Sequence, residues 1–232
     1  MIDPDRHLQI GSLLFEGIDQ IDLTGPFEVL SRIPNATYRI YAKDTEPVRD
    51  LRGLRLVADA ELEQAPSLDV LHVPGGYGQE ALMEDEQVLD WIRRQASGAL
   101  CVFSVCTGAL ICGAAGLLKG RRATSHWSAH HLLHHFGATP VNARVVEDGN
   151  MVFAAGVTSG IDGALTVAAR LRGVEAAQLI QLYMAYAPEP PFDAGTPESA
   201  PPIVLERAKA AAAEITARRA ETARRVQDRL GL

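Results

Sequence analysis

The strongest constraint on the fold is an alternation of short, mainly apolar runs with helical patterns of about 10 to 15 residues. The runs at residues 8–15, 69–73 and 100–105 have the length of strands. Strands that are apolar on both faces are typical of parallel sheets, because the helices that connect them cover both sides of the sheet. The sequence therefore predicts an α/β fold, a doubly wound sandwich with a mostly parallel central sheet.

The remaining elements follow the same alternation. Further strands are predicted at residues 38–42, 144–147 and 151–155, with a hairpin over 48–57 that turns near Arg52 and Gly53. Helices are predicted over residues 22–33, 84–96, 107–118 and 128–136, and from about 161 and 175. Proline favours the first turn of a helix, so Pro26 places the start of the first helix just before it. Ligands bind such sheets beyond the carboxyl ends of the strands, which predicts functional residues at 22, 74–78, 106–108 and 156–160.

Size and charge exclude several classes of protein. The 232 residues suffice for one compact domain with an appendage, and for a core that needs no disulfides. A net charge of -7 gives no electrostatic reason to bind nucleic acid or an anionic membrane. Three cysteines do not make a disulfide framework, which favours a reducing, cytoplasmic location. There is no basic signal sequence and no run near the ~20 apolar residues of a membrane span, so we expect a soluble protein.

The C-terminal part has a different composition. Residues 187–202 carry six of the thirteen prolines and are predicted to form an extended connector. Residues 203–232 hold seven basic and four acidic residues, a charge of +3 that leaves -10 on the first 202 residues. Apolar or small side chains recur there at near-helical spacing: Val204, Ala208, Ala211, Ile215, Thr222, Val226 and Leu230.

These patterns predict how the chain is divided. We expect residues 1–192 to form the α/β domain, and residues 193–232 to form the connector and a C-terminal helical extension. The narrow apolar stripe suits a helix that packs on its own domain or on a dimer partner. A basic tail that binds an acidic ligand is the alternative.

Cys106 is the leading candidate for a catalytic residue, because it lies between an apolar strand and a predicted helix. In such an elbow the nucleophile occupies a sharp turn and its side chain is exposed. The N–H groups at the helix N-terminus are expected to lower the pKa of the thiol, so that the thiolate is present at neutral pH. Cys101 and Cys112 are too far from Cys106 for a disulfide and are predicted to be core residues. The elbow alone also allows a buried, inert Cys106.

Two further groups are predicted to meet Cys106 at the edge of the sheet. The Pro74-Gly-Gly-Tyr-Gly78 turn closes a strand, and its N–H groups are candidates to stabilise negative charge on a substrate. Asp22 follows the first strand and is a candidate general acid/base, with a pKa raised by burial and by the thiolate. A carboxylate that caps the following helix is the alternative for Asp22.

Five of the seven histidines lie within residues 126–135. His126, His130 and His134 have the spacing of one α-helical face, which suits a metal site. No cysteine or carboxylate joins them locally, so we expect no metal here. His126 is a candidate partner for the Cys106 thiol.

Several motifs together resemble the ThiJ/PfpI superfamily: Ile21-Asp-Leu-Thr-Gly-Pro26, Val73-Pro-Gly-Gly76, Ser104-Val-Cys-Thr-Gly-Ala109, Arg122-Ala-Thr-Ser-His-Trp127 and Gly156-Val-Thr-Ser-Gly-Ile-Asp162. Within the superfamily the likeness is to the bacterial isonitrile hydratases, also called isocyanide hydratases, and it covers nearly the whole chain. The resemblance implies a homodimeric, flavodoxin-like sandwich with Cys106 as the nucleophile and no cofactor.

The resemblance also implies a reaction. The Cys106 thiolate attacks the terminal carbon of an isonitrile, R–N≡C, and forms a thioimidate whose nitrogen side gains a proton. Water then releases an N-substituted formamide. Asp22 supplies or relays the proton, and Thr107 contributes its backbone N–H and its hydroxyl. The implied residues of the substrate pocket are Gly76, Tyr77, Gly108, His126 and Trp127.

Differences between this sequence and other branches of the superfamily argue against some of the functions found there. Thr107 replaces the histidine of the Cys-His-Gly elbow in the protease-like branch, which argues against peptidase activity. A single terminal helix leaves no room for the paired helix-turn-helix units of a DNA-binding branch. Two alternatives remain at this point: glyoxalase or deglycase chemistry on 2-oxoaldehydes or their adducts, and a non-enzymatic ligand or oxidation sensor that uses an exposed thiolate.

Overall fold

The computed structural model describes residue 3 and residues 5–232. At its centre is a seven-stranded sheet with the strand order β10-β11-β7-β6-β1-β2-β5. All neighbouring strands are parallel except β10 and β11. The strands are β1 (Leu8–Leu13), β2 (Ala36–Ala42), β5 (Ala60–Glu61), β6 (Val70–Val73), β7 (Cys101–Val105), β10 (Val145–Asp148) and β11 (Met151–Ala154). The predicted doubly wound α/β sandwich is confirmed.

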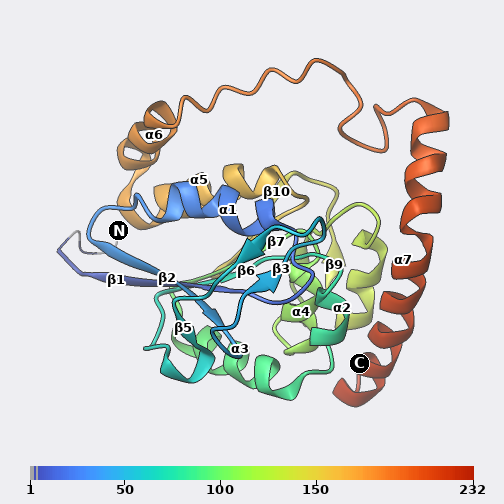
Figure 1. The fold of residues 1–232 in the computed structure, drawn as a ribbon, viewed down its shortest axis with the longest axis horizontal. Coiled ribbons are helices and arrows are strands. Elements are labelled where there is room, and N and C mark those ends of the chain that lie inside the picture. The colour runs from blue at the N-terminus through green and yellow to red at the C-terminus, as the bar shows by residue number, and fades with distance from the viewer. Residues whose placement is uncertain (1–2, 4) are drawn as a thin grey trace.

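Helices cover both faces of this sheet (Figure 1). On one face lie α1 (Gln20–Leu30) and α5 (Ser159–Arg172), and on the other α3 (Glu86–Gly98) and α4 (Gly108–Ala114). The apolar side chains accordingly form two separate cores. Strand β7 serves both, because Val102 belongs to one core and Phe103 to the other. The strands that read as unbroken apolar runs are therefore buried on both sides, as predicted.

Several short elements complete the domain. The predicted hairpin is formed by β3 (Val48–Arg49) and β4 (Arg55–Leu56), with Arg52 and Gly53 between them. Strands β8 (Arg122–Ala123) and β9 (Thr139–Pro140) pair with each other. The helices η1 (Leu62–Gln64) and α2 (Gln79–Leu82) are single turns. Sequence analysis did not predict β5, β8, β9, η1 or α2, all of which have only two to four residues and are too short to show a repeating hydrophobic pattern.

The first helix begins earlier than predicted. Asp19 is its N-cap, since its carboxylate accepts a hydrogen bond from the N–H of Ile21. Pro26 therefore lies inside α1 and not in its first turn, which corrects the prediction. Proline lacks the N–H that would bond to the carbonyl four residues earlier, so the carbonyl of Asp22 is left free of that bond and lies beside the buried ring of His72.

Two other helices differ from their predicted form. The helix after Cys106 ends at Ala114, because Gly116 adopts a left-handed conformation with φ of 84°. The histidine-rich segment is the 3₁₀-helix η2 (His130–Phe136). A 3₁₀-helix has three residues per turn, so residues four apart do not share a face, and the predicted α-helical row of histidines does not form.

The C-terminal segment crosses the molecule. After α6 (Val174–Tyr183) an exposed connector arches over the domain to α7 (Pro202–Leu230), which lies along its side (Figure 1). Helix α7 contacts η2, α2 and α4 of its own domain. Its buried residues are Ile215, Arg219, Thr222, Ala223 and Val226. No helix in the part of the chain that the structure describes is long and apolar enough to cross a membrane.

Candidate active site

Cys106 occupies the predicted sharp turn between β7 and α4. Its φ of 58° lies in the left-handed region, which is strained for a residue with a side chain. The surrounding backbone holds it there. The Cys106 N–H donates to the carbonyl of Ala154 at 2.9 Å, and the hydroxyl of Ser125 donates to the Cys106 carbonyl at 2.9 Å. The sulfur is thus fixed at the carboxyl end of the sheet.

The thiol itself differs from the prediction, because it is buried and protonated. Cys106 is only 6% exposed. Burial raises the pKa of Cys106 well above its ordinary value, and the nearby charge of Asp22 raises it further. The N–H of Thr107 favours the thiolate, yet α4 has only seven residues and its N-terminus does not offset desolvation. The prediction of a free, exposed thiolate at neutral pH is therefore wrong.

Asp22 lies directly beside Cys106. It is fully buried, and burial together with the charge of Asp19 raises its pKa to about 8. Its Oδ2 accepts a hydrogen bond from the N–H of Gly75 at 3.0 Å, and its carboxylate accepts one from the Cys106 thiol. Its Oδ1 has no hydrogen-bond partner among the described residues. The predicted rise in pKa has the expected direction, but the neighbouring charge comes from Asp19, which also takes the capping role.

The glycine turn after β6 connects these groups. The N–H of Gly76 donates to the Thr107 hydroxyl oxygen at 3.1 Å, as that of Gly75 does to Asp22. Both N–H groups are therefore engaged, and neither is free to stabilise charge on a substrate, which corrects the prediction. A Cβ on Gly75 would come within 2.6 Å of the Thr107 nitrogen. The absence of a side chain there lets Asp22 and Thr107 approach each other.

Thr107 and Gly108 have different positions. Thr107 is buried and directs its N–H toward the Cys106 sulfur. Gly108 begins α4 and packs against the end of β6, where a Cβ would meet the Val73 carbonyl oxygen at 2.0 Å. Gly108 is not among the residues that line the cavity described next. Its position therefore fits close packing of helix on strand, not contact with a substrate.

A cavity of about 270 Å³ opens over the sulfur. Among its walls are five predicted site residues besides Cys106: Gly76, Tyr77, Thr107, His126 and Trp127. Asp22 is not among the residues that line this cavity. One whole side is formed by α7 through Ala208, Ala211, Ala212, Ile215 and Arg219. The terminal helix, which the sequence predicts to pack on its own domain or on a dimer partner, thus also covers the nucleophile.

Arg219 is the functional candidate that sequence analysis missed. It is 2% exposed, and its guanidinium donates to the Gly76 carbonyl at 2.7 Å and to the Gln79 side chain at 3.0 Å. It also lies over the ring of Tyr77. A signal was present, since Arg219 fills the gap in the apolar stripe between Ile215 and Thr222. A charge on the buried side of an amphipathic helix is unusual.

His126 does not pair with Cys106. Its Nδ1 is hydrogen-bonded to the Ser128 hydroxyl at 2.8 Å. Burial lowers the pKa of His126 to about 4, so the ring is neutral near pH 7. Within the described residues there is no group of three or more His, Cys, Asp or Glu side chains that could hold a metal ion.

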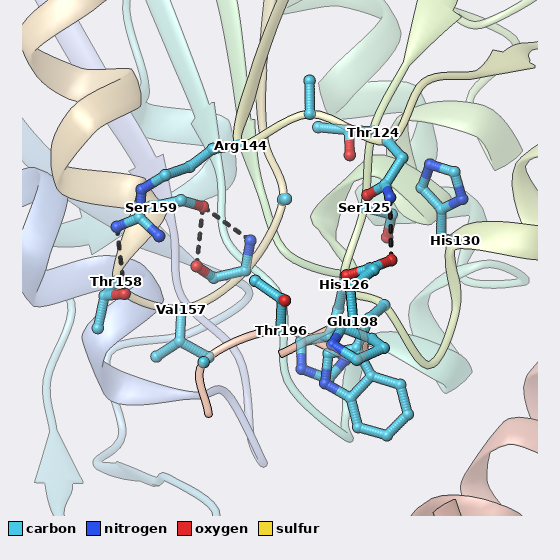
Figure 2. Close-up of a pocket in the computed structure, with 17 residues that line it drawn as sticks. Thr124, Ser125, His126, His130, Arg144, Val157, Thr158, Ser159, Thr196 and Glu198 are labelled. Atoms are coloured by element: carbon cyan, nitrogen blue, oxygen red, sulfur yellow. Dashed lines mark hydrogen bonds between the residues drawn. The ribbon is translucent and has the colours of Figure 1, made fainter. Parts of the chain in front are cut away.

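A second cavity of about 560 Å³ adjoins the first and shares His126, Trp127 and Val157 with it. Figure 2 shows Arg144 and Thr158 at one end and His126 and His130 at the other. Thr196 and Glu198 of the connector lie between these ends. The connector therefore contributes to the surroundings of the site as well as linking α6 to α7.

Comparisons with known proteins show the family to which the chain belongs. The chain is 51% identical to an isonitrile hydratase of Pseudomonas putida, over 97% of this chain and 99% of the relative. A crystal structure of a ThiJ/PfpI family protein from Pseudomonas syringae superposes with a TM-score of 0.91 at 40% identity, covering 94% of this chain and 91% of that one. Drosophila melanogaster DJ-1beta shares the fold with a TM-score of 0.72 at 24% identity, covering 79% of this chain and 100% of that one. Residues 9–170 match the profile of the DJ-1/PfpI family, a span that takes in Asp22, the glycine turn and Cys106, and the chain belongs to that family.

Proposed function

We propose that this protein hydrates isonitriles to N-substituted formamides, with Cys106 as the nucleophile and Asp22 as the acid/base. One observation carries the proposal. A buried thiol is hydrogen-bonded to a buried carboxyl group whose pKa is about 8, beside a largely apolar cavity. A carboxyl group with that pKa both accepts and donates protons near neutral pH. The 51% identity to an isonitrile hydratase supports the same reaction class.

The first half of the reaction forms a covalent intermediate. Asp22, which is protonated at rest, donates its proton to the terminal carbon of R–N≡C, which carries the lone pair, as the Cys106 sulfur bonds to that carbon. The Asp22 carboxylate formed in this way accepts the thiol proton. The product is a thioimidate, Cys–S–CH=N–R, and Asp22 is again protonated. The high pKa of the thiol is consistent with this order, because the proton leaves only as the S–C bond forms.

The second half consumes water. Asp22 donates its proton to the nitrogen of the thioimidate, water attacks the carbon, and the Asp22 carboxylate accepts a proton from that water, which leaves Cys–S–CH(OH)–NH–R. The C–S bond then breaks, the hydroxyl proton passes to the sulfur, and R–NH–CHO leaves. The balance is one isonitrile and one water for one formamide, and it requires no cofactor.

The neighbouring residues have supporting roles in this proposal. The N–H of Thr107 stabilises negative charge on the sulfur, and its hydroxyl holds the Gly76 peptide. Tyr77 and Trp127, with the alanines of α7, receive the R group. The neutral ring of His126 is a wall of the cavity and not an acid. We assign Gly108 to packing and not to substrate binding.

We also propose that the protein is a cytoplasmic homodimer. Three buried free cysteines suit a reducing compartment. Helix α6 exposes Leu179, Leu182 and Tyr183, each more than two-thirds exposed, and an apolar patch of this kind suits a protein interface. Leu182→Glu should therefore yield a monomer in sedimentation velocity, whereas Glu175→Gln on the same helix should not. A monomeric wild-type protein would contradict the dimer.

The function is tested by incubation with a simple aliphatic isocyanide and quantification of the formamide. Wild type should form product, and Cys106→Ala and Asp22→Asn should form none above background. Mass spectrometry of wild type should detect an adduct equal to the mass of the isonitrile on Cys106. No product from wild type refutes the proposal, and turnover of methylglyoxal instead would favour glyoxalase-type chemistry. Full activity of Cys106→Ala would refute the mechanism.

A further inference from the structure

Arg219 is the one arginine of α7 that is buried, and it has no carboxylate partner among the described residues. Arg218, Arg225 and Arg229 form ion pairs with Glu80, Glu84 and Glu86 at 3.7, 2.7 and 2.6 Å. Among the described residues, no carboxylate lies within 4 Å of the Arg219 guanidinium. Its Nη2 and Nε bond to neutral groups, the Gly76 carbonyl and the Gln79 amide. A single positive charge is therefore buried without a counter-ion.

Such an arrangement is costly for stability. Burial of an ionised group without an opposite charge is unfavourable, and burial lowers the pKa of Arg219 accordingly. At rest, neither the Asp22 carboxyl group nor the Cys106 thiol neutralises the charge of Arg219, because both are protonated: the pKa of Asp22 is about 8 and that of Cys106 is higher still. Arg219 lines the same cavity as Cys106. The charge is thus placed where a negative charge appears only during a reaction.

We propose that Arg219 is the counter-ion of the Cys106 sulfur while the sulfur is anionic, which makes the C-terminal helix part of the catalytic apparatus. Arg219 acts through Cys106 and is therefore a positioning residue. The proposal rests on the proposed function for the moments at which the anion occurs, as the S–C bond forms and as it breaks. The charge of Arg219 lowers the pKa of Cys106, which agrees with this role.

The same side chain also orders the elbow. Arg219 holds the Gly76 carbonyl, the Gly76 N–H bonds to the Thr107 hydroxyl, and the Thr107 N–H faces the sulfur. Loss of Arg219 would thus remove a charge and loosen the peptide that positions Thr107. Asp19 also lines the cavity, and Glu80 lies close to Arg219. The electrostatic potential at the sulfur therefore reflects these acidic side chains as well as the buried positive charge of Arg219.

Alkylation of Cys106 tests the proposal without any isonitrile. Iodoacetate is anionic, iodoacetamide is neutral, and they are similar in size. The rate of alkylation by iodoacetate divided by the rate with iodoacetamide therefore reports the electrostatic potential at the sulfur. In wild type, measured by mass spectrometry at one pH, this ratio should exceed that of free cysteine, even though the first 202 residues carry -10. Arg219→Gln should lower the ratio about tenfold or more, as expected for the loss of one unit charge that lines the same cavity as the sulfur, at low effective dielectric.

Two variants separate charge from structure. Arg218→Gln removes the same charge from the adjacent, half-exposed position, and its ratio should stay within about twofold of wild type. Arg219→Lys keeps the charge and should retain most of the ratio. A wild-type ratio no higher than that of free cysteine overturns the proposal, and that measurement needs no variant to fold. An unchanged ratio in folded Arg219→Gln also overturns it, whether or not isonitriles are substrates.

Discussion

Asp22 carries a proton in the folded protein near neutral pH, and its replacement by asparagine should therefore change how stability depends on pH. The pKa of Asp22 rises from 3.8 to about 8 on folding. Below pH 4 the carboxyl group is protonated in both states. Between pH 4 and 8 the unfolded chain loses the proton and the folded protein keeps it, so rising pH favours unfolding. Above pH 8 both states are ionised and the effect levels off.

The magnitude follows from the shift. One pKa unit corresponds to about 1.4 kcal/mol, and a shift of about four units gives a total of about 5 to 6 kcal/mol. Of this total, about 4 kcal/mol of stability is lost between pH 5 and 8. The free energy of unfolding of wild type should thus fall by about 4 kcal/mol more than that of Asp22→Asn over this interval. Asparagine keeps an oxygen that can accept from Gly75, so the variant should fold.

Urea denaturation at pH 5, 6.5 and 8 and at one protein concentration measures this difference. Other titrating groups, including the buried His72 and His126, are present in both proteins and cancel in the comparison. Asp44→Asn, on an exposed turn, serves as the matched control and should follow wild type. Parallel pH dependence of wild type and Asp22→Asn would show that Asp22 is ionised at neutral pH, and the proton transfers assigned to it would then be wrong.

Two further changes probe the shape of the site. Gly75→Ala places a methyl group 2.6 Å from the Thr107 nitrogen, so it should abolish formamide production and lower the melting temperature, whereas Gly195→Ala, whose Cβ meets nothing within 4 Å, should do neither. Equal activity of the two glycine variants would contradict the close approach of Asp22 and Thr107. Ala211→Leu should fill part of the 270 Å³ cavity, raising KM severalfold for a bulky isonitrile while leaving the smallest one unaffected. A uniform loss across substrates would argue that α7 does not select them.

The parts of the structure that the sequence predicts are those that depend on local pattern. Phe103 and Val102 point to opposite cores because they are adjacent on a strand, and the apolar run already required both cores. The elbow is local as well, since strand, cysteine and helix are contiguous around Cys106. Its backbone strain, with φ of 58°, fits a position that tertiary contacts must hold in place.

The errors arise where partners are distant in sequence. The burial that raises the pKa of Cys106 is not revealed by any pattern around residue 106, and one wall of the cavity over its sulfur comes from the distant helix α7. The glycine N–H groups are engaged by Asp22 and Thr107, 53 and 31 residues away, and Arg219 reaches Gly76 across 143. The prediction for the histidine-rich segment is wrong for another reason. The same residues suit a 3₁₀-helix and an α-helix, and only packing decides between them.

The exposed connector has an evolutionary consequence. It joins the domain that holds Cys106 and Asp22 to the helix that forms the opposite wall, and it places few packing demands on either. Substitutions on the inner face of α7 can therefore alter which molecules reach the sulfur without disturbing the sheet that positions it. Within this architecture, the share of selectivity that α7 contributes through residues other than Arg219 is encoded in a stretch of the gene separate from Cys106 and Asp22, and it is free to diverge at its own rate.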